Sequence, residues 1–268
     1  MTISTLDGVI AGMKPIEKFL KVGATMEAAG VLHSFLYTAG VPGAGVAPTP
    51  GLAGAALTTY AGQIPFTNPV SGNSYLARFA ASAGVVGGAI LYDRLWHNSG
   101  FTITTTTAQT VNSAAWPARD NNGLTDGDGV LVALEVSTVT GNGGAITNTT
   151  MSYTNQDGTA GRTATIASFP ATAVAGTFVP FALQAGDTGI RSIQSLTLGT
   201  TYVSGTVHLV AYRELAWVDI KEANVGDAVD AVTGGFPRLY DNTVPCLLWL
   251  PSATTAITLQ GQFGYTQG

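Results

Sequence analysis

The sequence predicts a mainly β protein, in which a β-sandwich or jelly-roll-like domain follows a short helical N-terminal region and an extended Pro/Gly/Ala-rich arm. Short runs with alternating apolar and polar residues recur from residue 73 onward, as half-buried strands require. Clusters of Gly, Asn and Asp separate these runs and favour turns. Only 10% of the 268 residues are charged, against roughly 25% in ordinary soluble domains. Either much of the surface is buried against other subunits, or the protein works in an extracellular lattice, and both explanations indicate assembly.

Residues 1–39 carry apolar residues at helical spacing and predict two short helices. Ser4 or Thr5 is placed to cap the first helix, and Pro15 kinks or restarts it. Thr25 is placed to cap the second. Because isolated short helices are only marginally stable, we expect them to need a partner surface.

Residues 40–72 form a segment that is rich in Pro, Gly and Ala and almost free of charge. A free linker is usually more polar than this. Two interpretations stay open: an extended arm laid on a neighbouring protein, or a long loop packed on its own domain. The predicted domain organisation is N-terminal helices and anchoring arm over 1–72, a β-sandwich domain over 73–215, and a mixed segment over 216–268. The last segment ends in strands that we expect to pack on the same β domain.

Alternation predicts the strands of the β domain and their inward faces. In one of them Val132, Leu134 and Val136 share a face, while Glu135 and Ser137 share the other. The expected strands span residues 74–82, 88–97, 101–111, 129–138, 146–155, 161–168, 176–183, 189–198 and 204–215, followed by 244–250 and 256–267.

The run TITTTTAQT, from Thr102 to Thr110, is uncharged and rich in β-branched threonine. Because threonine favours strands, the run is predicted to be one strand of the sandwich. Neither face of such a strand would be charged or strongly apolar. We therefore expect a neighbouring subunit to cover it.

Few residues form patterns that indicate chemistry. His33, His97 and His208 lie far apart and have no ligands at metal-binding spacing, so they are interpreted as structural. Cys246 stands in an apolar run and is predicted to be a buried hydrophobic residue. The chain is therefore not predicted to be an enzyme, and no cofactor is expected.

The one candidate metal site is the loop ARDNNGLTDGDG, which contains Asp120, Asp126 and Asp128. Clustered Asp and Asn can bind Ca²⁺ through oxygen atoms. The spacing fails the calcium-loop pattern, because Leu124 stands where Asp or Asn is needed. A solvated loop between strands is the preferred interpretation.

Charged pairs interrupt two apolar strands, Asp93 with Arg94 and Arg213 with Glu214. A glycosidase would need two carboxylates that face one cleft. The sequence gives no sign of such a cleft, so these charges are predicted to form salt bridges at strand ends or subunit contacts.

The overall charge bears on the class of partner. A net charge of −5 without any run of Lys or Arg disfavours nucleic acid as a partner. No apolar run reaches the length of a membrane span, and the N-terminal residues do not resemble a secretory signal. We therefore expect no membrane partner and synthesis in a cytoplasm.

Long phrases between residues 90 and 215 resemble virion structural proteins of tailed bacteriophages, in particular auxiliary proteins that decorate or cement the head. They include ILYDRLWHNSGFTITTTTAQTV, GDGVLVALEVSTVTGNGG and GIRSIQSLTLGTTYVSGTVHLVAYREL. The resemblance implies a non-catalytic protein on the capsid surface, made in the bacterial host cytoplasm. It also implies contacts with the major capsid protein and with copies of itself, for which a trimer is expected.

Two other functions are weighed beside this one. A tail or fibre component involved in host attachment is the main alternative, and it would show exposed aromatic residues for stacking on sugars. Trp116 and Tyr153 are the candidates for that role. A virion-bound glycan hydrolase is the third, and no carboxylate pair in the sequence supports it.

Overall fold

The computed structural model describes residues 3, 5–23, 28–235 and 237–268. The described chain is mainly β, with a single short α-helix, and its sheets are consistent with the predicted β-sandwich-like fold. It divides into two compact units. Unit 1 comprises residues 1–46, 58–93 and 214–268, and unit 2 comprises residues 47–57 and 94–213. These units divide the chain differently from the expected boundaries at 72/73 and 215/216, because strands distant in sequence complete each core.

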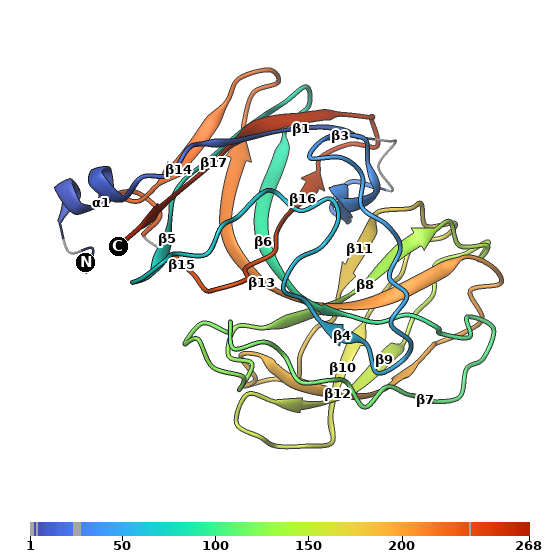
Figure 1. The fold of residues 1–268 in the computed structure, drawn as a ribbon. Helices are drawn as coiled ribbons and strands as arrows, with labels where there is room; N and C mark the ends of the chain where they lie inside the picture. Colours follow the sequence, from blue (N-terminus) through green and yellow to red (C-terminus); the bar gives the residue numbers. More distant parts are fainter. Residues whose placement is uncertain (1–2, 4, 24–27, 236) are drawn as a thin grey trace. The chain divides into compact units, whose positions relative to one another are not determined.

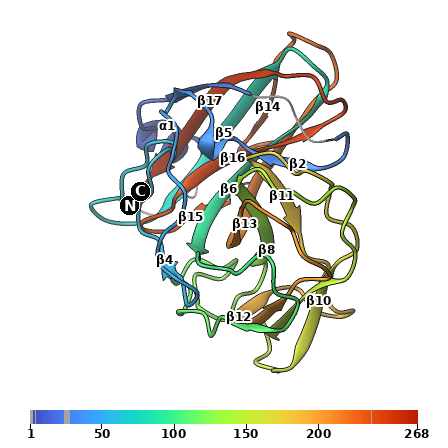
Figure 2. The same cartoon turned by 90° about the vertical axis from the view of Figure 1, so that its right-hand side faces the viewer.

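The main sheet of unit 1, here called the β17 sheet, has the strand order β14-β5-β17-β1-β3, with β15 also paired to β5 (Figures 1 and 2). Its pairings are antiparallel. The strands are β1 (Glu17–Val22), β3 (Gly40–Val41), β5 (Ser74–Ala83), β14 (Asp227–Asp230), β15 (Arg238–Leu239) and β17 (Thr258–Gln267).

A second layer closes the core of unit 1. In it, β16 (Pro245–Pro251) pairs with β2 (Leu32–Ser34) and with the first part of β6 (Gly87–His97). The end of β13 (Thr206–Ile220) adds Leu215, Val218 and Ile220 to the same core. Phe19, Phe79 and other inward residues of the β17 sheet pack against these strands, and burial of this apolar surface stabilises the unit.

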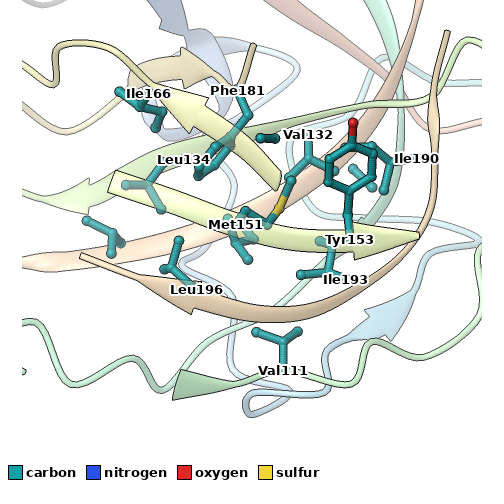
Figure 3. Close-up of a cluster of buried hydrophobic side chains, with 14 of the residues drawn as sticks. Val111, Val132, Leu134, Met151, Tyr153, Ile166, Phe181, Ile190, Ile193 and Leu196 are labelled. Atoms are coloured by element: carbon teal, nitrogen blue, oxygen red, sulfur yellow. The ribbon is translucent and has the colours of Figure 1, made fainter. Parts of the chain in front are cut away.

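Unit 2 is also built from two layers. The β9 sheet has the order β10-β9-β12-β7, and the β8 layer places β8 between β13 and β11. Met151 of β9 and Ile193 and Leu196 of β12 meet Val132 and Leu134 of β8 in the core (Figure 3). The remaining strands of unit 2 are β4 (Ala55–Ala56), β7 (Gln109–Thr110), β8 (Leu131–Thr138), β9 (Thr149–Asn155), β10 (Arg162–Ile166), β11 (Thr177–Pro180) and β12 (Ile190–Thr197).

The predicted N-terminal helices are corrected in part. Thr5 caps α1 (Leu6–Gly12), and its Oγ1 accepts the Gly8 N–H at 3.1 Å. The helical continuation past Pro15 is wrong, because residues 17–22 form β1 between β17 and β3. The second helix is also wrong over its described part, where β2 is followed by a 3₁₀ turn, η1 (Phe35–Tyr37). The predicted caps Ser4 and Thr25 lie outside the described residues.

The predicted arm has little regular structure, but its backbone is bonded to its own chain. Within unit 2, the Leu57 N–H donates to the Leu95 carbonyl at 2.8 Å, and the Trp96 Nε1–H donates to the Ala53 carbonyl at 3.2 Å. Gly54 lies so close to the Trp96 ring that a Cβ atom there would be 2.2 Å from a ring carbon. Of the two interpretations, these contacts favour a long loop packed on its own domain.

The threonine-rich run forms a strand only at its end. Residues 102–107 are turn and coil, and only Gln109 and Thr110 pair, with β12. The side chain of Gln109 folds back onto residue 102: its Oε1 accepts the Thr102 N–H at 2.8 Å and its Nε2 donates to the Thr102 carbonyl at 3.1 Å. The strand predicted over 101–111 is therefore wrong for most of its length.

The burial of Leu134 on β8 predicts that its truncation costs far more stability than truncation of an exposed leucine in the same unit. Leu134 is fully buried in the core of unit 2, whereas Leu124 is 53% exposed in a loop. We expect Leu134→Ala to lower the free energy of unfolding by about 2–5 kcal/mol, because it leaves a cavity. Leu124→Ala is the matched control and should change it little. Equal effects of the two substitutions in denaturant titrations would contradict this assignment of the core.

Candidate functional site

The Asp-rich loop is a hydrogen-bonded turn at the edge of unit 2. The Asp120 carboxylate accepts backbone N–H groups of Asn122 at 2.9 Å, Leu124 at 2.8 Å and Gly127 at 3.1 Å. Three such bonds hold the loop closed and use the oxygens that a cation would need. The Asp120 side chain therefore stabilises the turn by accepting hydrogen bonds from its backbone.

The other two carboxylates of the loop are also bonded within unit 2. Asp128 accepts from Thr188 Oγ1 at 2.9 Å and from Asn122 Nδ2 at 3.2 Å. Asp126 pairs with Arg191 at 3.3 Å, with both side chains about half exposed. Across the described part of the chain, no group of three or more His, Cys, Asp or Glu is arranged to hold a metal ion. The geometry thus supports a structural loop.

A buried ion pair is the most conspicuous polar feature of unit 2. Arg94 of β6 donates from Nη1 to Oε1 of Glu135 at 3.0 Å and from Nη2 to Oε2 at 2.6 Å. Both side chains are fully buried. A two-pronged contact of this kind satisfies the guanidinium and the carboxylate together. The sequence identified the charge of Arg94 but not its partner, because Glu135 lies 41 residues away.

Two histidines complete the polar cluster around this pair. Arg94 Nε donates to His97 Nδ1 at 3.2 Å, so His97 is an acceptor there and is neutral. His208 Nδ1 lies 2.8 Å from the Asn98 carbonyl and must donate to it, which leaves Nε2 to accept from Ser137 Oγ at 2.7 Å. Burial and the neighbouring Arg94 lower the pKa of His97 to about 3. Burial also lowers the pKa of His208.

The contact between Ser137 and His208 has the composition of a nucleophile and its base. His208 is almost completely buried, and its other nitrogen is fixed by a backbone carbonyl. The contact satisfies a polar group of each residue on the β8 layer. Arg119, which the sequence did not single out, has the same role: it is buried and donates to the carbonyls of Leu57 at 2.7 Å and Arg94 at 3.3 Å.

The aromatic candidates for sugar stacking are buried, which corrects that expectation. Trp116 is 3% exposed, and its Nε1–H donates to the Ile190 carbonyl at 2.6 Å. Tyr153 is fully buried, and its hydroxyl donates to Asp187, which also pairs with Arg162 at 2.9 Å. Neither ring is open to a ligand. Cys246 is buried as predicted.

The outer face of the β17 sheet is an open surface of unit 1. Register places Lys18, Gln262, Ala80 and Ala228 in one row across four strands. Leu20, Gln260 and Ser82 form the next row. These residues line a shallow hollow of about 820 Å³. Its lining is mostly small, amide-bearing or aliphatic, and its charged members are Lys18, Arg78 and Asp227.

Two cations stand on this face without an ion pair. Among the described residues, neither Lys18 nor Arg78 lies within salt-bridge distance of a carboxylate, although Asp230 is the register partner of Arg78. By contrast, Arg94, Arg162 and Arg191 are all paired within unit 2. Asp227 lines the same hollow, so its lining carries two cations and one carboxylate, a balance that favours a partner with acidic groups. No helix among the described residues is long and apolar enough to cross a membrane.

Comparisons with known proteins give no family for this chain. No family model matches it, and no curated protein matches its sequence. Among solved structures it is similar to the infectious bursal disease virus VP2 subviral particle, with 11% identity over 96% of this chain and 81% of that chain, at a TM-score of 0.20. The T13 particle of the same virus gives 10% identity over 96% and 78% of the two chains, at a TM-score of 0.17. TM-scores of this size lie below that of a shared fold, so these likenesses carry no functional argument.

Neutralising one residue of the buried Arg94–Glu135 ion pair tests its contribution to stability. We expect Glu135→Gln to cost about 3–5 kcal/mol of unfolding free energy, because Arg94 keeps its charge without a buried counter-ion. Asp126→Asn breaks the exposed pair with Arg191 and should cost less than about 1 kcal/mol. Denaturant titrations of both variants against the parent chain measure the difference. Similar costs for both would show that the buried charge is compensated elsewhere.

The lowered pKa values of His97 and His208 predict a loss of stability in mild acid. His97 is neutral when folded and takes up a proton on unfolding below about pH 6.5, so the unfolding free energy falls as the pH drops through that value. Between pH 7.5 and 5.5 we expect a loss of about 1 kcal/mol from His97, and the lowered pKa of His208 acts in the same direction. This window lies above the titration of Asp187, whose pKa Arg162 lowers to about 2.

His97→Gln separates this effect from general acid denaturation. The variant should show a smaller loss between the two pH values than the parent chain, whatever its absolute stability. An unchanged pH dependence would mean that His97 is already protonated in the folded state.

Proposed function

We propose that this chain is a non-enzymatic structural protein of a tailed-phage virion, which decorates or cements the head by bridging subunits of the major capsid protein. Its place would be the capsid surface, after synthesis in the bacterial host cytoplasm. The sequence resemblance over residues 90–215 supports this proposal, and so does the scarcity of charged residues. No nucleic acid, membrane or cofactor has a part in it.

The observation that carries the proposal is the outer face of the β17 sheet. It is an ordered, open surface across several strands, with a shallow hollow whose lining includes Lys18, Arg78 and Asp227. Small residues such as Ala80 and Ala228 allow another backbone to approach closely, while Gln260 and Gln262 offer both hydrogen-bond donors and acceptors. Such a face can pack closely against another protein and form hydrogen bonds with it.

Lys18 and Arg78 give this face its preference for a partner. Opposite potentials steer association and fix orientation, even where they add little affinity. We expect the contacting part of the shell protein to be acidic. Each contact would be modest, and repetition over a symmetric shell would make the attachment strong.

The alternative of a host-attachment module loses its main support in the structure. Trp116 and Tyr153 are buried and cannot stack on sugars. Trp217 is the one tryptophan among the described residues that is substantially exposed, at 44%. One exposed ring does not form the aromatic cluster that this alternative requires.

Fractionation of purified particles tests the location. We expect the protein to copurify with heads after heads and tails are separated, at a copy number comparable with that of the major capsid protein. Quantitative mass spectrometry of the two fractions provides the measurement. Recovery with tails, at a few copies per particle, would exclude the cement function.

Rebinding to heads that have been depleted of the protein tests the proposed face. Lys18→Glu combined with Arg78→Glu should weaken binding, because it reverses the charge that meets an acidic partner. Lys221→Glu is the matched control, since Lys221 is exposed in unit 1 but does not line the hollow. Equal rebinding by both variants would exclude this face as the docking surface.

A further inference from the structure

The helix α1 presents an apolar stripe to solvent. Val9 packs against its own unit, whereas Leu6 and Ile10 are 66% and 64% exposed and Met13 is 37% exposed. Their spacing of four and three residues places these side chains on one side of the helix and its end. A stripe at this spacing is typical of a helix that docks into an apolar groove.

The stripe is held in a fixed position by the C-terminal strand. Thr266 Oγ1 donates to the Val9 carbonyl at 2.8 Å, and the Lys14 N–H donates to the Tyr265 carbonyl at 3.0 Å. Gly12 passes so close to β17 that a Cβ atom there would lie 2.4 Å from the Gln267 carbonyl oxygen. A surface that is ordered before it binds loses less entropy on association.

An apolar groove lies directly beside the helix. It has a volume of about 480 Å³ and is lined by Ile3, Thr5, Leu6, Val9, Tyr75, Ala231 and Val232. Val232 is 83% exposed at its rim. None of the lining residues is charged, so the groove would accept an aliphatic stripe like the one that α1 carries.

The charges that flank the stripe indicate which partner fits. Asp7 lies in the first turn of α1 and Lys14 lies just after its end. Within the described chain, neither residue forms a salt bridge. They are seven residues apart, with Ile10 midway between them. An antiparallel copy of the same helix therefore brings opposite charges together at both ends.

We propose that two copies of this chain pair through α1 about a two-fold axis that passes close to Ile10. Ile10 of each copy meets Ile10 of the other, and Asp7 of each lies beside Lys14 of the other. The exposed ends of the stripe, Leu6 and Met13, then cover the groove of the opposite copy. In such an interface the same patch is used on both sides, as two-fold symmetry requires. This pairing goes beyond the proposed function and does not rest on it.

Sedimentation velocity of the full chain over a dilution series tests the pairing without any shell present. We expect a concentration-dependent dimer, and we expect Ile10→Asp to weaken it at least tenfold by placing two carboxylates at the axis. Val46→Asp is the matched control, because Val46 is also exposed in unit 1 but lies outside the groove. A parent chain that stays monomeric at every concentration would overturn the proposal.

Charge exchange tests the antiparallel orientation. Asp7→Lys alone and Lys14→Asp alone should each weaken the dimer several-fold, since exposed ion pairs contribute modestly and each occurs twice. The double exchange should restore the affinity, because opposite charges again face each other. Additive losses in the double variant would overturn the proposed orientation.

Cross-linking locates the axis even if the dimer is weak. Ile10→Cys should form a disulfide between copies under mild oxidation, because a two-fold axis brings the two Cα atoms within the short range that a disulfide allows. The native Cys246 is buried and should not react. Val46→Cys is the control. Dimer formation that is equal at positions 10 and 46 would show random collision and overturn the assignment.

Discussion

The Arg94–Glu135 ion pair allows β8 to be buried on both of its faces. One face of β8 supplies Val132, Leu134 and Val136 to the core of unit 2, and the opposite face carries Glu135. A lone buried carboxylate would be costly, so the strand requires the two-pronged contact with Arg94. His97, which is neutral, and His208, whose pKa is lowered by burial, extend the cluster.

The need to pair buried charges also accounts for where the few charged residues of this chain lie. Many of its cations are committed inside the fold: Lys21 donates to the carbonyls of Pro42 and Gly43, at 2.8 and 3.1 Å, and Arg119 donates to those of Leu57 and Arg94. Charge therefore stabilises strands and loops internally. Lys18 and Arg78 stand out because they are exposed on an open sheet face. The proposed docking surface follows from that contrast.

The two proposed contact surfaces of unit 1 differ in chemistry and symmetry. The outer face of the β17 sheet is broad and polar, and its two cations against one carboxylate favour an unlike acidic partner. The stripe on α1 is narrow and apolar. In an antiparallel pair of these helices, Asp7 of each copy faces Lys14 of the other. A protein with both features could join copies of itself and also attach to a lattice.

The sequence by itself determined the β class, most strand positions and the inward face of β8, because alternation with a period of two reports which side of a strand is buried. It did not determine the secondary structure of residues 17–22 and 102–107. The first run is a strand because β17 and β3 supply hydrogen-bonding partners, and the second, rich in β-branched threonine, is mostly turn because Gln109 bonds back to residue 102. The partner of Arg94, the burial of Trp116 and the open face of the β17 sheet were likewise decided only by tertiary structure. Each depends on residues far apart in the chain, and no local pattern records which of them meet.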